Sequence, residues 1–218
     1  MIYKSVLLFT IFGLILLWTP LVFGAIGGET SNVEEVTEDE QAQEAYENDQ
    51  SFTAKKEVTV NGHTFPPGTE FNSGSGFDVP DGKYVTGPDG GMYTGSGIQM
   101  ENGQLKNAEQ IGLETSEGSA EGRNAQNMNF NPPRYTIGSA DYWQTSDFTV
   151  FNGQGIQKSS NAFTVKKAEK IELNNMTLTD AELLYATEDE LSIVSADKVE
   201  GNGLKADNII NSTYSIRP

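Results

Sequence analysis

Cysteine is absent from the 218 residues, which excludes a disulfide framework and any thiolate metal site. His63 is the only histidine, so zinc sites built from several imidazoles are excluded as well. Basic residues are few: 14 Lys and Arg stand against 31 Asp and Glu, and the formal net charge is −17. Nucleic acid and anionic lipid surfaces attract proteins mainly through Lys and Arg, so neither is expected as a partner. Packing and backbone hydrogen bonds must hold the fold, and no cofactor is expected.

The one long apolar run lies at the N-terminus, at residues 6–23, "VLLFTIFGLILLWTPLVF", shortly after Lys4. Small residues near Gly24 make residues 1–24 a secretory signal peptide cut at about that point. The alternative is an uncleaved membrane anchor, since the apolar run continues to Gly28 and is long enough to span a bilayer. Either interpretation predicts an exported protein, periplasmic or at the cell surface, that meets a membrane only through this segment if it is kept.

Two regions of different composition follow the apolar run. Residues 25–54 hold nine acidic residues and no Lys or Arg, which predicts a disordered acidic linker. Residues 55–131 are rich in glycine and predict a β region of short strands. Within it, alternating β-forming residues flank Asn61-Gly62, the pair that a tight type I′ hairpin turn favours.

A repeat occupies residues 135–210, in a predicted domain over 132–218. The stretches "YTIGSADYW" (135–143), "FTVKKAEKI" (163–171) and "LSIVSADKV" (191–199) begin 28 residues apart. Apolar residues match at their first, third and last positions, and an Ala followed by an acidic residue matches between them. The halves between these stretches also match, at Phe148, Met176 and Leu204 and at the residues that follow. Such agreement indicates an all-β repeat protein.

Within each half-unit the alternation of apolar and polar residues shifts by one position, which predicts a strand with a bend or bulge near Ala168 and its equivalents. Two architectures fit. In a β-solenoid-like stack each 28-residue unit is one coil, which the regular spacing favours. In a V-bent antiparallel β-jelly roll each half-unit is one bent strand, which the short turns favour. Residues 176–191 resemble a helix by content, but their place in the repeat predicts a strand.

The repeat resembles a known family. The segments "IVSADKVEGNGLKADNI" (193–209) and "VKKAEKIELNNMTLTDAEL" (165–183) are similar to the short A-[DE]-K-[VI] repeats of the OstA-like lipopolysaccharide-transport jelly-roll family. The resemblance covers residues 135–210 and excludes the Gly-rich region before them. It implies a periplasmic or membrane-tethered protein that carries lipid in an apolar trough.

Candidate site residues are few. Asp141, Glu169 and Asp197 are equivalent in the repeat, so a stacked arrangement predicts an acidic ladder that a Ca²⁺ ion could occupy. The alternative is a solvated outer face whose charge Lys167, Lys170 and Lys198 compensate. His63 lies beside a hairpin turn and is not expected to be catalytic.

Three functional hypotheses follow. The first is a non-catalytic structural or binding protein of the cell surface or envelope, whose expected partners are envelope or surface components, with a glycan or a lipid as candidate ligands. The second is the envelope lipid carrier that the resemblance implies. The third is a polysaccharide lyase or hydrolase on a β-helix, which requires clustered carboxylates. The repeat also reaches "NSTYSIRP" without a polar cap, which predicts end-to-end self-association.

Overall fold

The computed structural model describes residues 34–215, except for residues 75, 116–117, 132, 174 and 188. The predicted signal peptide or membrane anchor therefore lies outside the described residues. No helix among the described residues is long and apolar enough to cross a membrane.

Short elements come first along the chain. They are β1 (Glu34–Val36), α1 (Asp39–Glu47), β2 (Phe52–Ala54), β3 (Val58–Val60), β4 (His63–Phe65), β5 (Glu70–Asn72), β6 (Gly76–Asp78), β7 (Val85–Thr86), β8 (Met92–Ser96) and β9 (Ile98–Glu101). The strands β3 and β4 form the hairpin that Asn61-Gly62 predicts, with Val60 opposite His63 and positive φ at both turn residues.

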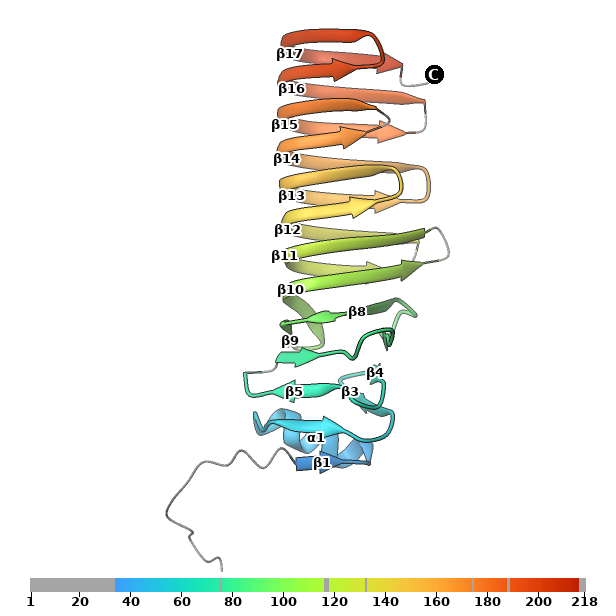
Figure 1. Cartoon of the computed structure of the whole chain (residues 1–218), viewed down its shortest axis with the longest axis vertical. Helices are drawn as coiled ribbons and strands as arrows, with labels where there is room; N and C mark the ends of the chain where they lie inside the picture. Colours follow the sequence, from blue (N-terminus) through green and yellow to red (C-terminus); the bar gives the residue numbers. More distant parts are fainter. Residues whose placement is uncertain are drawn as a thin grey trace, which may run out of the picture. The chain divides into compact units, whose positions relative to one another are not determined.

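Eight long strands follow and stack one above another along one axis (Figure 1). They are β10 (Gln104–Thr115), β11 (Gly118–Asn131), β12 (Arg134–Thr145), β13 (Phe148–Ser159), β14 (Ala162–Leu173), β15 (Met176–Thr187), β16 (Glu190–Gly201) and β17 (Leu204–Ser215). The all-β repeat is thus confirmed, and residues 176–187 form a strand as the repeat predicts.

Each long strand pairs antiparallel with the next. Only two residues separate consecutive strands, a length that suits a hairpin and is too short for a parallel crossover. The stacking along one axis is solenoid-like, while the strand pairing is that of the bent antiparallel sheet. The 28-residue unit is therefore a hairpin of two bent strands, and equivalent residues lie two strands apart.

Every long strand bends in the middle, and β15 shows how. Its buried residues Met176, Leu178, Ala181, Leu184 and Ala186 lie two, three, three and two residues apart. Each three-residue step contains one residue with positive φ, Asp180 or Leu183, which lets the strand bend while its inner face stays continuous. In β14 the buried residues around Ala168 have the same spacing, which confirms the bend predicted there, although no residue of β14 has positive φ.

The central inner residue of each strand lies in the inside corner of the bend and is small in all but the last. We call this set the corner column. Its members are Ala108, Ala125, Ala140, Gly153, Ala168, Ala181, Ala196 and Ile209. The first member, Ala108, belongs to β10, so the bent strands begin well before the predicted boundary at residue 132.

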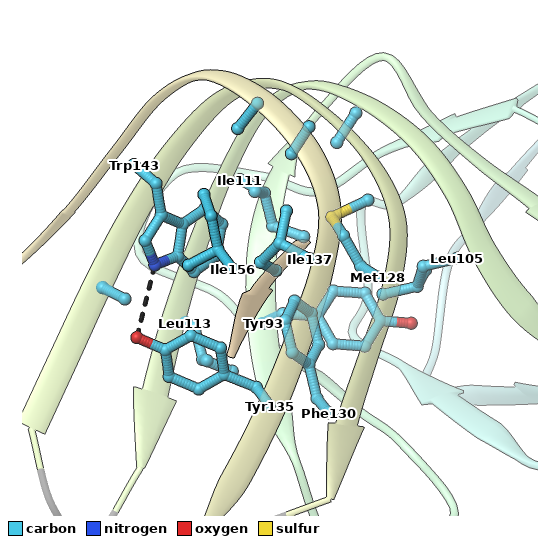
Figure 2. Close-up of a cluster of buried hydrophobic side chains, with 14 of the residues drawn as sticks. Tyr93, Leu105, Ile111, Leu113, Met128, Phe130, Tyr135, Ile137, Trp143 and Ile156 are labelled. Atoms are coloured by element: carbon cyan, nitrogen blue, oxygen red, sulfur yellow. Dashed lines mark hydrogen bonds between the residues drawn. The ribbon is translucent and has the colours of Figure 1, made fainter. Parts of the chain in front are cut away.

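The two arms of the bent strands enclose a continuous apolar interior. Figure 2 shows part of it, with side chains from β8 and β10–β13 converging between the arms. Trp143 is fully buried there, and its Nε1–H donates to the hydroxyl of Tyr135 at 3.2 Å. A Cβ on Gly122, which lies opposite, would come within 2.4 Å of the Trp143 ring, so this position requires glycine.

The predicted acidic linker differs from the structure over residues 34–54, which form β1, α1 and β2. Ala42, Ala45 and Tyr46 are spaced to share one face of α1, and both alanines are buried. The Tyr46 hydroxyl donates to the Met100 carbonyl at 2.9 Å. The acidic residues of α1 remain in water, so their charge does not prevent a helix that packs through a narrow apolar stripe.

Candidate functional site

The predicted acidic residues do not form a ladder of neighbours. Asp141, Glu169 and Asp197 lie on β12, β14 and β16, on alternate strands and so about 9–10 Å apart. Each of the first two accepts a hydrogen bond from an asparagine on the preceding strand: the Asn124 side chain donates to Asp141 at 2.7 Å, and the Asn152 side chain donates to Glu169. At this separation the carboxylates repel one another only weakly in water, so a bound cation has little repulsion to relieve.

The third copy of this arrangement differs. Asp180 stands where Asn152 stands one repeat earlier. The pairing of the residues on either side of Asp180 places it opposite Asp197. Three acidic residues thus follow one another across β14, β15 and β16. Even so, within the described ranges no group of three His, Cys, Asp or Glu side chains is close enough to hold a metal ion.

The lysines expected to compensate these acids pair with others. Lys167 lies 3.8 Å from Glu182, while Lys170 and Lys198 each pair with the glutamate two residues further along their own strands. Lys198 and Lys205 hold the pKa of Glu200 below its usual value. These are exposed ion pairs, which contribute little to stability and suit a solvated outer face.

A second feature is an outward ladder on one arm of the stack. Arg123, Tyr142, Phe151 and Lys170 lie directly opposite one another on β11–β14. Arg123 lies over the Tyr142 ring at 5.6 Å, Lys170 lies over the Phe151 ring at 5.1 Å, and the two rings meet edge to face at 5.5 Å. Each ring is thus flanked by its neighbours, an arrangement that stabilises the outer face of the sheet.

A hollow of about 330 Å³ adjoins this ladder on the outer face of β8, β10, β11 and β12. Its polar lining includes Asp81, Gln110, Glu121 and Arg123, and the Tyr142 ring closes one side. Carboxylate, amide and guanidinium groups together offer both donors and acceptors, so the hollow suits a hydroxyl-rich ligand. Sequence reasoning missed the hollow, because the turn at 79–82 that completes it lies far from β10–β12 in the chain.

The third feature surrounds His63, which is buried beside a hollow of about 150 Å³. Its Nδ1–H donates to the Asn61 carbonyl at 3.2 Å, so the neutral ring keeps its free nitrogen at Nε2. Burial lowers the pKa of His63, against smaller opposing effects of Asn61 and Asp89. The neighbouring Tyr93 hydroxyl is buried, and burial raises its pKa.

The chain matches no protein-family model, no curated protein and no solved structure. The functional argument therefore depends on the geometry of the chain itself.

Proposed function

We propose that this chain is an exported, non-catalytic β-repeat protein with a structural role at the cell surface or in the envelope. The observation that supports this most is the filled interior of the bent sheet. From β10 to β16, the large apolar side chains that face inward are all buried against one another. A stack packed in this way is a rigid body that can hold two surfaces apart or present its outer face.

The filled interior favours a structural role over lipid carriage. A carrier keeps an apolar surface open for acyl chains, whereas the corner column of this protein is lined by alanines with 4% exposure or less. The strongly acidic surface also repels an anionic glycolipid headgroup.

The filled corner can be tested with Ala168→Phe. In a filled interior the larger side chain has no space, and we expect it to lower the free energy of unfolding by about 2 kcal/mol or more. An outward change of similar size, Lys166→Phe, serves as the matched control. Urea unfolding measures both variants, and an Ala168→Phe variant as stable as the parent would instead indicate an open trough.

Export is tested separately. Expression in the native host, followed by N-terminal sequencing of the recovered protein, should give a mature chain that begins close to Ala25. A recovered chain that still carries residues 1–24 and remains in the membrane fraction would support the anchored alternative.

The outer hollow supports a second candidate, the binding of a neutral glycan. Sugar hydroxyls match the mixed donors and acceptors of Asp81, Glu121 and Arg123. Calorimetric titration with a panel of neutral oligosaccharides should detect binding that Arg123→Gln weakens and that Arg134→Gln, outside the hollow, leaves unchanged. Absence of binding across the panel, or equal weakening by both variants, would refute this assignment.

A further inference from the structure

The stack ends differently at its two ends. At one end α1 and the short strands β1–β9 cover the apolar interior, whereas β17 lies at the other (Figure 1). Among the described strands, the register of β17 (Leu204–Ser215) is shared with β16 alone. Its inner residues Leu204, Ala206 and Tyr214 are only half-buried, so apolar surface and backbone hydrogen-bonding groups remain available along this edge.

The edge of β17 is symmetric about Ile209. The more buried residues are Leu204, Ala206, Ile209, Ser212 and Tyr214, and the residues between them are exposed. This pattern reads the same in both directions from Ile209. A second β17 that runs antiparallel and is aligned on Ile209 would therefore place every inner residue opposite an inner residue. Every outward-facing residue would then lie opposite another outward-facing residue.

The side chains that would then face each other are compatible. Lys205 would meet Thr213 of the partner subunit, and Asp207 would meet Asn211 of the partner subunit, so no like charges oppose each other. Leu204 would meet Tyr214 of the partner subunit, an apolar pair at each end of the inner layer.

The size of Ile209 is a separate indication that β17 differs from the other long strands. Every other member of the corner column is Ala or Gly, because the corner is occupied by strands on both sides. Only β17, with one neighbour, has room for a larger side chain. Ile209 is only 4% exposed and fills the corner of its own subunit, so in an antiparallel pair the two filled corners would lie opposite each other.

We propose that two copies of this chain form a symmetric dimer through antiparallel pairing of their β17 strands, with Ile209 on the twofold axis. The bent sheet then continues from one subunit into the other, and each outer end is covered by α1 and its neighbours. Such an interface uses the same strand of both subunits, as a twofold axis requires. It goes beyond the structural role proposed above and does not depend on it.

Disulfide trapping tests the register, because the chain contains no other cysteine. In the full chain, Ile209→Cys places the two thiols on directly opposite residues, whose Cα atoms lie about 4.5–5.5 Å apart, within disulfide reach. The matched control, Ala206→Cys, places its thiol opposite Ser212 of the partner subunit, far from the second copy of itself. We expect a covalent dimer on mild oxidation of the Ile209 variant and none for the control. No covalent dimer from Ile209→Cys, or equal amounts from both variants, would overturn the proposal.

A charge exchange tests the same interface without touching the interior. Asn211→Asp sets a carboxylate opposite Asp207 of the partner subunit at two symmetric places, and should weaken the dimer about tenfold or more at low ionic strength. Asp207→Asn added to Asn211→Asp exchanges the two residues and should restore the dimer. Asn127→Asp, at an equivalent exposed bend position of β11, is the control for added charge and should have no effect.

Sedimentation equilibrium over a wide concentration range measures these dissociation constants in the full chain. The proposal expects a mass twice that of one chain for the unsubstituted protein. A monomer at every concentration, as when another segment or protein occupies the edge, would overturn it, and so would weakening by Asn127→Asp equal to that by Asn211→Asp.

Discussion

Leu183 is the clearest local conflict in the fold, and replacing it should stabilise the protein. Its φ is 49°, in the left-handed region, where a side chain other than Gly or Asn is strained by about 1–2 kcal/mol. The equivalent positions one repeat earlier and one later are Gly155 and Asn211. Leu183 is also 56% exposed, so its apolar surface is only partly removed from water.

Leu183→Asn removes most of this strain and loses little burial. We expect the free energy of unfolding to rise by about 1 kcal/mol, which corresponds to roughly 2–4 °C in Tm for a chain of this size. The reverse change, Asn127→Leu at the equivalent bend of β11, should destabilise the protein by a similar amount.

Urea unfolding followed by circular dichroism measures both variants. A shift in midpoint with an unchanged slope reports stability alone. A Leu183→Asn variant less stable than the parent would refute the reasoning, because it would mean that the exposed leucine contributes more by packing than it loses by strain. An Asn127→Leu variant of unchanged stability would refute the account of the bend itself.

Two further predictions concern charge. Asp180→Asn should give Asp197 the hydrogen bond that Asn152 gives Glu169 one repeat earlier, and should raise the free energy of unfolding by about 0.5–1 kcal/mol at low salt. Asn152→Asp should lower it by a similar amount. An unchanged midpoint of urea unfolding in both variants would contradict this account. Because burial lowers the pKa of His63, its contribution to stability is fully present above the unfolded value of about 6.5 and is lost as the pH falls below it. Between pH 7.5 and 5.5 the parent should therefore lose more stability than His63→Gln, and equal losses measured by urea unfolding would contradict the predicted direction.

The bent repeat could be predicted from the sequence to a large extent. The 28-residue spacing and the Ala-acid pair of each unit show the period, and the change of parity around Ala168 shows the bend. The first copy, Ala108-Glu109, lies 32 rather than 28 residues before Ala140, because β11 is two residues longer than the other long strands and Ala108 lies two residues nearer the start of its own strand. A search for the Ala-acid pair without a fixed spacing would have found it.

The arrangement of the acidic residues could not be predicted in the same way. A 28-residue period fits one coil or one hairpin equally well, and only the strand pairing decides whether Asp141 and Glu169 are neighbours. The asparagines at 124 and 152 were a usable signal, since they recur at the repeat spacing and tolerate positive φ.

The N-terminal end was the hardest part to predict. The stripe of α1 is short and contains two alanines, whose contribution to an apolar pattern is weak. Its packing depends on partners such as Met100, which lie more than 50 residues away in the sequence. Composition alone therefore favoured a disordered linker, whereas in the structure β1, α1 and β2 cover one end of the stack.

Native mass spectrometry of the protein produced in its own host, followed by solvent extraction, tests the central claim most directly. A filled interior predicts the mass of the bare polypeptide, as monomer or dimer, and no lipid in the extract. A co-purified lipid or glycolipid in stoichiometric amount would contradict the filled interior and favour carriage.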